Sequence, residues 1–278
     1  MAAPESPRTA EALERLAQGV AALITSRAWQ AYLDTARRFH NYSFANILLI
    51  RAQVPEATRV AGFQAWKALG RTVRRGEHAI WILAPLTRRL AAEEEDDPAE
   101  KVRVIMGFRA VSVFDVSQTD GEPLAELPCH RLSGDDPTGS YDRLRRFAHG
   151  LGYTVEEDYL PGEMNGDCNF ALRRLRIEVR NDELQQAKSL AHELGHVLLH
   201  DGFPGSRELA ELEAESVAYL VCDGLGLDSS SYSFGYVANW AGGGAGALAG
   251  IKASGRRVQS AARQILDGLA TIQAAQAA

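Results

Sequence analysis

The segment HELGH at 192–196 carries the residues whose types and spacing most clearly indicate chemistry. On an α-helix, His192 and His196 lie about 40° apart around the axis and about 6 Å apart along it, so both imidazoles can bind one ion. Glu193 lies about 100° further round, where its carboxylate can reach a water molecule on that ion. Apolar residues recur around the motif at helical spacing, so the helix is predicted independently of it. We predict a metal site; the alternative is a pair of partly buried structural histidines.

A catalytic zinc site needs three protein ligands and one open position. His200 continues the series of histidines, but it lies about 12 Å along the axis from His192, too far for three imidazoles of one helix to converge. The next helix, ELAELEAESVAYLV at 208–221, offers several glutamates. Glu213 lies in the middle of its apolar stripe, whereas Glu211 and Glu215 lie about 160° away. Since a carboxylate that faces a core is normally paired or bound to metal, Glu213 is the predicted third ligand.

This ligand set predicts hydrolysis of a peptide bond. Zinc lowers the pKa of a bound water molecule, and Glu193 accepts the proton as general base. Another divalent ion, such as Mn²⁺, is an alternative to Zn²⁺. The reaction also needs an acid or oxyanion donor, for which the sequence offers three candidates that it does not rank: Tyr232, Tyr236 and His200.

The interpretation of Glu213 has one main alternative, a salt bridge to an arginine such as Arg207 or Arg173. The order HELGHVLLH and then ELEAESVAYLVC resembles the ImmA/IrrE family of zincin-like metallopeptidases, whose second motif has the form E-A-x-x-x-A. The resemblance implies that the metal is held by the two motif histidines, His192 and His196, and by the glutamate before the alanine, Glu213.

The N-terminal third of the chain differs in charge from the rest. Residues 1–92 contain 13 Lys and Arg against 6 Asp and Glu, a net charge of +7, while residues 126–278 contain 14 against 21. Arginines cluster in RTVRRGEHAIW at 71–81, close to Trp66 and Trp81. Single-stranded nucleic acid is held by cations along the phosphates and by aromatic rings that stack on bases. The alternative is that the tryptophans belong to the core and the arginines to a solvated turn.

Three ordered blocks within residues 10–121 resemble the N-terminal domain of ArdC-type antirestriction proteins: NYSFANILLIRAQ, ATRVAGFQAWKALGRTVRRGEHAIWILAP and VSVFDVSQTDG. The resemblance implies binding of single-stranded DNA by this domain, a metallopeptidase-like domain after it, and an origin on plasmids or other mobile elements. The residues that we expect to contact DNA are Tyr42, Asn46, Trp66, Arg71, Arg74 and Arg75.

The elements that must position these residues form an α+β protein. Helices are expected over about 9–38, as one broken or two consecutive helices, and over 43–53 and 62–70. The runs HAIWILAP, VRVIMGF and AVSVFDVS read as three strands of a small sheet. After them come a helix from Tyr141, a strand, a hairpin over 169–180 and helices near 183–200, 208–224 and 254–272. We therefore expect an ArdC-like domain at 1–125, a linker at 126–140 and a zincin-like domain, carrying the HExxH helix, at 141–278.

Composition narrows the function classes. No run of about 20 apolar residues is present, so no membrane segment is expected. Cys129, Cys168 and Cys222 fit neither a disulfide framework nor a zinc knuckle, which favours a reducing compartment, the cytoplasm.

Three functions remain open. The first is a DNA-binding antirestriction protein with a zinc-dependent peptidase domain that acts on a protein substrate which the sequence does not identify. The second is an ImmA-like peptidase that cleaves a DNA-bound regulator. The third is a non-enzymatic protein that protects DNA and whose metal stabilises the fold.

Overall fold

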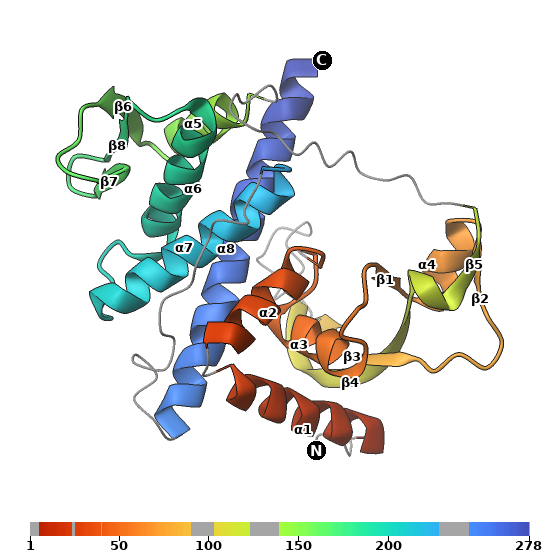
Figure 1. Ribbon diagram of the computed structural model, residues 1–278. Coiled ribbons are helices and arrows are strands. Elements are labelled where there is room, and N and C mark those ends of the chain that lie inside the picture. The colour runs from red at the N-terminus through yellow and green to blue at the C-terminus, as the bar shows by residue number, and fades with distance from the viewer. Residues whose placement is uncertain are drawn as a thin grey trace, which may run out of the picture. The chain divides into compact units, whose positions relative to one another are not determined.

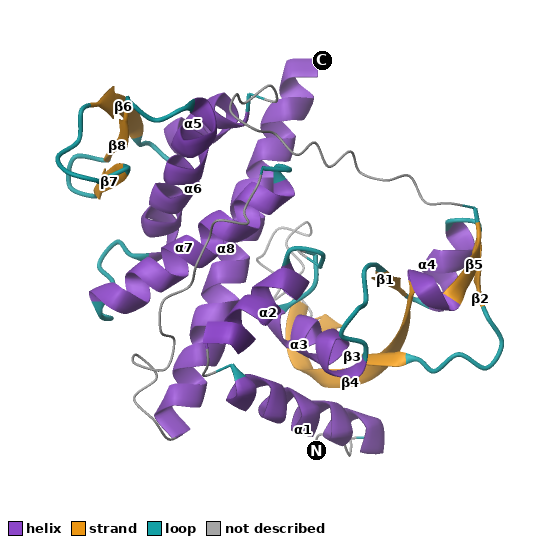
Figure 2. Ribbon diagram, viewed as in Figure 1, coloured by secondary structure: helices purple, strands orange, loops and turns teal. Residues whose placement is uncertain are grey.

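The computed structural model describes residues 6–23, 26–39, 41–89, 103–122, 139–227 and 245–277 (Figure 1). Helices and strands occur largely in separate runs along the chain, as expected for an α+β protein (Figure 2). The helices are α1 (Pro7–Ala22), α2 (Ser26–Ala36), α3 (Phe44–Gln53), α4 (Phe63–Ala68), α5 (Ser140–Gly150), α6 (Glu183–Leu199), α7 (Arg207–Gly224) and α8 (Ala245–Ala277). The strands are β1 (Val60–Ala61), β2 (Arg71–Val73), β3 (Ile80–Arg89), β4 (Arg103–Asp115), β5 (Thr119–Gly121), β6 (Thr154–Asp158), β7 (Gly166–Asn169) and β8 (Arg174–Glu178).

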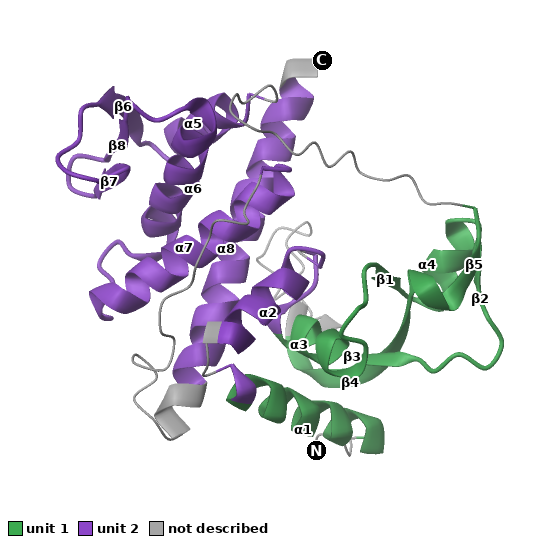
Figure 3. Cartoon of the chain, viewed as in Figure 1, with its two compact units in different colours: residues 1–21, 45–124 green, residues 22–44, 125–278 purple. Residues whose placement is uncertain are grey.

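The chain divides into two compact units (Figure 3). The first contains residues 1–21 and 45–124, and the second contains residues 22–44 and 125–278. The segment 22–44, which the sequence analysis assigned to the N-terminal domain, therefore groups with the second unit. Its helix α2 buries Trp29 and Tyr32 completely, and the indole of Trp29 donates a hydrogen bond to Ser216 of α7. Most of the expected linker lies outside the described residues.

A long antiparallel hairpin dominates the first unit. Strands β3 and β4 pair from Ile80↔Val113 to Arg89↔Arg103, with a register shift between Leu86 and Thr87. The expected division of residues 102–117 into two strands is thus wrong. Strand β4 continues through Gly107, which has φ 157° and pairs with Leu86 at the register shift. Such an irregularity bends a strand without ending it, and the pairing with β3 continues on both sides.

Helix α3 covers the outer edge of this hairpin. The sheet order is β1-β4-β3, so one edge of β3 has no neighbouring strand within the described part of the chain. Side-chain amides of α3 replace that neighbour: Asn46 exchanges two 2.9 Å hydrogen bonds with the backbone of Leu83, and Gln53 does the same with Trp81. Both amides therefore satisfy backbone groups that an edge strand would otherwise leave unpaired.

The second unit packs helices α5, α6, α7 and α8 together and adds a three-stranded sheet of order β6-β8-β7. Its core includes Leu144, Leu190, Val217 and Ile265, one from each of these helices and each without exposed surface. The hairpin predicted near 169–180 is confirmed as β7 and β8, which pair antiparallel. Helix α8 is longer than expected. Among the described helices, none is both long and apolar enough to cross a bilayer.

Candidate metal centre

Helix α6 presents the HELGH histidines on one face. The helix begins after Asp182, whose carboxylate accepts a hydrogen bond of 2.8 Å from the backbone N–H of Gln185, and it ends at Leu199. Leu190 and Leu194, both fully buried, anchor the opposite face in the core. His192 and His196 are consequently held side by side, with their Nε2 atoms 3.1 Å apart.

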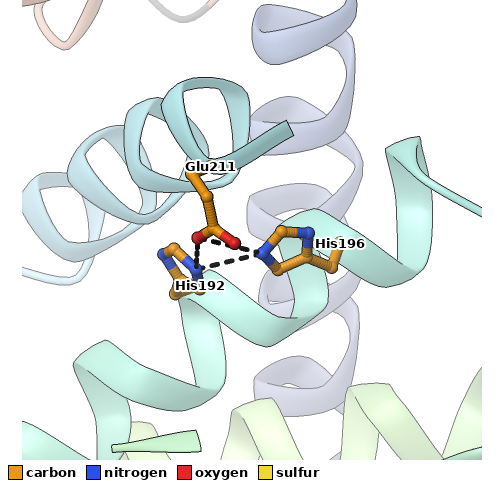
Figure 4. A group of neighbouring side chains, drawn as sticks. All are labelled: His192, His196 and Glu211. Atoms are coloured by element: carbon orange, nitrogen blue, oxygen red, sulfur yellow. Dashed lines mark hydrogen bonds and ion pairs between the residues drawn. The ribbon is translucent and has the colours of Figure 1, made fainter. Parts of the chain in front are cut away.

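A carboxylate from α7 completes the cluster (Figure 4). One oxygen of Glu211 lies 3.4 Å from His192 Nε2 and 3.6 Å from His196 Nε2. Three ligands of a tetrahedral zinc ion with bonds of about 2.0–2.1 Å lie roughly 3.3–3.4 Å from one another. The three observed separations of 3.1, 3.4 and 3.6 Å fall around that value, so the residues fit a divalent ion.

Glu213, predicted as the third ligand, lies elsewhere. Its side chain has no exposed surface and contacts His200 Nε2, at 3.2 Å, and the guanidinium of Arg257 on α8. The helical angles correctly place Glu213 on the inward stripe of α7, but that stripe faces α8 and the end of α6. Glu211, on the flank of the helix, is the glutamate that lies near Nε2 of both His192 and His196. The geometry therefore matches the salt-bridge alternative for Glu213, with Arg257 rather than Arg207 or Arg173 as the cation.

Close packing of α6 on α7 brings Glu211 to the histidines. A Cβ atom at Gly195 would lie 3.0 Å from Cα and 3.2 Å from the carbonyl oxygen of Ala214. Both distances are shorter than ordinary van der Waals contact between carbon atoms, so the glycine within HELGH allows the two helices to approach each other.

The carboxylate of Glu193 lies beside this cluster and is almost fully buried. Burial raises its pKa to about 7, although the neighbouring His192 opposes the shift. A Cβ atom at Gly166 of β7 would lie 2.7 Å from one oxygen of Glu193, so only glycine lets this strand pass so close. A carboxylate with a pKa near neutrality suits a general base.

His192 and Glu193 border a cleft of about 300 Å³. Its lining comprises Asn165, Gly166, Gln185, Lys188, Ser189, His192, Glu193 and Glu215. Of the three candidates for the acid or oxyanion donor, Tyr232 and Tyr236 lie outside the described residues. His200 is buried and is not among the residues that line this cleft.

Glu215 orients His192 from the far side of its ring. One carboxylate oxygen lies 3.0 Å from His192 Nδ1. Burial lowers the pKa of His192, but Glu211 and Glu215 more than reverse this effect and raise that pKa to about 10. The same contacts with the two histidines hold the pKa of Glu211 far below its usual range despite burial. The cluster is therefore negatively charged enough to attract a cation.

The structure places most of the residues predicted to contact DNA in structural roles. Asn46 is buried against β3, as described above, and Trp66 is fully buried, with its indole N–H bonded to the carbonyl of Phe114 at 2.8 Å. Arg71 is bonded to Thr119 and to the backbone of Gly121, and Arg74 pairs with Glu77 and Asp120.

The remaining two predicted residues belong to different units. Arg75 is exposed on the first unit. Tyr42 is partly buried in the segment that groups with the second unit, and burial raises its pKa. Because Asn46 and Trp66 are buried, the six predicted residues do not all lie on a surface that DNA can contact.

The first unit carries a groove that the sequence analysis did not predict. The guanidinium of Arg8 lies 4.2 Å from the centre of the Trp81 ring, and the groove around them has a volume of about 360 Å³. Its lining comprises Arg8, Glu11, Ala12, Arg15, Ala52, Gln53, Val54, His78, Ala79, Ile80 and Trp81. The alternation of side chains along strand β3 indicates the outward position of Trp81. Ile80 and Ile82 face the core, so Trp81 between them faces the other way.

Comparisons with known proteins agree with the two parts of the chain. Residues 7–114 match the N-terminal domain of anti-restriction factor ArdC, and residues 141–222 match the IrrE N-terminal-like domain of peptidase family M78. The chain is 26% identical over 246 residues to an uncharacterized protein of Bacillus anthracis. That match covers 73% of the chain but 41% of the relative, so the chain spans about two fifths of that protein's length.

Two solved structures share the fold. The metal-free crystal structure of the antirestriction ArdC protein from plasmid R388 has a TM-score of 0.51, with 20% identity over 81% of this chain and 82% of that one. Its Mn(II)-bound crystal structure has a TM-score of 0.50, also with 20% identity, over 82% of this chain and 83% of that one. At this identity the likeness establishes the fold alone.

Proposed function

We propose that this chain, in which an ArdC-type N-terminal domain precedes an IrrE-like domain of peptidase family M78, is a cytoplasmic antirestriction protein that binds single-stranded DNA and hydrolyses peptide bonds at a zinc centre. One observation carries the hydrolytic part of the proposal. His192, His196 and Glu211 converge within the dimensions of one ion, and the buried carboxylate of Glu193 borders the cleft that His192 also lines.

Each residue of the centre has a defined task in this proposal. His192, His196 and Glu211 hold the ion, which when bound polarises a carbonyl group and acidifies a water molecule. Glu193 has a pKa of about 7, so near neutral pH it accepts a proton from the attacking water and returns it to the leaving amine. The edge strand β7 passes beside Glu193 and offers backbone groups to an extended peptide.

The replacement Glu193→Gln tests the hydrolytic assignment in the full chain. We expect the variant to retain one divalent ion per chain and to lose cleavage of an unstructured peptide library by at least about 100-fold. A matched control is Glu183→Gln, which neutralises an exposed carboxylate in the first turn of the same helix. Cleavage by Glu193→Gln at the wild-type rate would show that the site is not a hydrolase of this kind.

The groove around Trp81 favours the DNA-binding part of the proposal. Its indole and two exposed arginines, Arg8 and Arg15, line one hollow, which has room for a nucleobase and its phosphate. A stacked base contributes about 1–3 kcal/mol, and each neutralised phosphate makes binding more sensitive to salt. This groove replaces the six predicted residues as the proposed contact surface.

Binding of a labelled single-stranded oligonucleotide tests this surface. We expect Trp81→Leu to weaken binding at least about fivefold, as the loss of one stacked base requires. The double replacement Arg8→Gln and Arg15→Gln should weaken binding and make it less dependent on salt concentration. Arg109→Gln, a change at an exposed arginine outside the groove, should alter neither the affinity nor its salt dependence. Unchanged binding by Trp81→Leu and by the double variant would exclude the groove.

The same variants separate the alternative functions. Protection of DNA from restriction that survives Glu193→Gln, with metal still bound, would mean that hydrolysis is dispensable and that the metal stabilises the fold. If Glu193→Gln loses protection, and the wild type but not this variant cleaves a DNA-bound regulator, the ImmA-like function would be favoured.

A further inference from the structure

A line of polar side chains, of which His200 and Glu213 are buried, runs from the candidate metal centre to α8. His196 Nδ1 lies 2.9 Å from His200 Nδ1, and His200 Nε2 lies 3.2 Å from one oxygen of Glu213. Arg257 donates hydrogen bonds to both oxygens of Glu213, one of them from Nε at 3.3 Å. Figure 4 shows that one ring nitrogen of His196 points at His192 and Glu211 while the other points away. The line therefore begins at the nitrogen of His196 that faces away from the cluster.

When the rings of His196 and His200 are both neutral, donors and acceptors along this line can be assigned in only one order. A carboxylate whose two oxygens accept from a guanidinium has no hydrogen to donate, so His200 Nε2 must donate to Glu213. In a neutral imidazole the other nitrogen is then an acceptor, which makes His200 Nδ1 the acceptor. His196 Nδ1 must in turn donate to it. The lone pair of His196 is thereby left on Nε2, the nitrogen that faces His192 and Glu211.

We propose that Glu213 and Arg257, acting through His200, are positioning residues that hold His196 in the tautomer able to bind a metal. The proposal rests on the proposed metal centre, since it assigns Nε2 of His196 to the ion. It also explains why the fully buried carboxylate of Glu213 is paired with Arg257 behind the site, where an unpaired charge would be costly. His192 is held in a similar way but with no residue in between, because the carboxylate of Glu215 contacts its Nδ1 directly.

The isosteric replacement Glu213→Gln should exchange donor and acceptor in each hydrogen bond between residue 213, His200 and His196. Arg257 still donates to the amide oxygen, so the new NH₂ group faces His200 Nε2 and turns it into an acceptor. His200 Nδ1 then donates to His196 Nδ1, and the proton of His196 moves to Nε2. We expect affinity for Zn²⁺ to fall roughly 10- to 100-fold, the usual effect of losing a partner of a metal-bound histidine.

Nitrogen-15 NMR of the imidazoles in the metal-free full-length protein tests the assignment directly. We expect the proton of neutral His196 on Nδ1 in the wild type and on Nε2 in Glu213→Gln. A proton on Nε2 of the wild type would overturn the proposal whether or not any variant folds. Because this readout needs neither metal nor peptide, it also separates failure of the proposal from failure of the proposed peptidase.

The zinc affinities of matched variants provide a second test of the positioning role. Glu178→Gln removes another buried carboxylate that is paired with an arginine, Arg180, and should leave zinc affinity unchanged. Glu211→Gln removes a proposed ligand and should weaken binding more than Glu213→Gln does. The opposite ranking, with metal lost in Glu213→Gln but kept in Glu211→Gln, would make Glu213 the ligand and overturn the positioning role.

Discussion

The indole N–H of Trp29 donates a hydrogen bond to Ser216 Oγ, 3.0 Å away, and joins helices that are 187 residues apart in the sequence. Trp29 lies within the segment that matches the ArdC N-terminal domain, whereas Ser216 lies within the IrrE-like segment. Both belong to the second compact unit. The unit that carries the metal centre is thus built from both matched segments.

This hydrogen bond gives the first prediction. Ser216 also donates to the carbonyl of Leu212 at 2.7 Å, so Ser216→Ala leaves the buried indole N–H without its partner. We expect a loss of about 1–3 kcal/mol in the free energy of unfolding, measured by urea denaturation. A double-mutant cycle with Trp29→Phe should show coupling, because the second change adds little once the bond is gone. Additive effects of the two changes would contradict a shared hydrogen bond.

Gly195 gives a prediction about the metal centre. In Gly195→Ala the new methyl group meets the backbone of Ala214, so α7 must move away and carry Glu211 with it. We expect weaker zinc binding, measured against a competing chelator, together with a lower unfolding midpoint. Gly150→Ala is the matched control, since its methyl group would meet nothing within 4 Å. Equal zinc affinities for both variants would show that the helices need no close approach.

The sequence predicted the main helices and the side-by-side placement of His192 and His196, because the signals for both are local. An apolar stripe and an i, i+4 pair lie within a few turns of one helix, so tertiary contacts are not needed to detect them. The third ligand is a different problem. Helical angles show that Glu213 faces inward, but they do not show what it faces. The answer is Arg257 of α8, 44 residues later, and no periodicity connects the two.

The tryptophans illustrate the same limit in the first unit. Composition placed Trp66 and Trp81 together as aromatic neighbours of an arginine cluster. The structure buries Trp66 against β4 and leaves Trp81 partly exposed beside Arg8, a residue from α1. Strand alternation indicates that Trp81 faces outward, but the approach of α1 is a tertiary contact. The two strands predicted at 102–108 and 110–117 likewise proved to be one, because both parts pair with the same strand β3.

Glu178 gives a prediction of pH dependence away from the metal. Its carboxylate accepts hydrogen bonds from Arg180 and from the backbone of Leu160, and these hold its pKa down at about 2 although burial opposes the shift. Because the folded pKa lies below the unfolded value of about 4.3, the stabilisation is complete above that value and is lost as the pH falls towards 2. Glu178→Gln should therefore be less stable at pH 7 and lose less stability between pH 5 and 2.

Urea midpoints at pH 7, 4 and 2.5 measure this difference. Glu156→Gln, a change at an exposed carboxylate of the neighbouring strand β6, serves as the control and should follow the wild type. Parallel pH profiles for the wild type and Glu178→Gln would mean that this carboxylate titrates alike in the folded and unfolded chains.

His192 gives the last prediction, that protons compete with zinc. With a pKa of about 10, its ring carries a proton at neutral pH in the metal-free protein, and its two N–H groups face Glu211 and Glu215. An ion that binds Nε2 must displace this proton. Because Glu211 stays ionised throughout and Glu193, with a pKa of about 7, is ionised above pH 8, one proton is released per ion, and zinc affinity should rise about tenfold per pH unit between pH 8 and 9. Calorimetry in two buffers of different ionisation enthalpy counts that proton. Affinity that does not change over this range, with no proton released, would mean that His192 is already neutral and that the two carboxylates do not hold its proton.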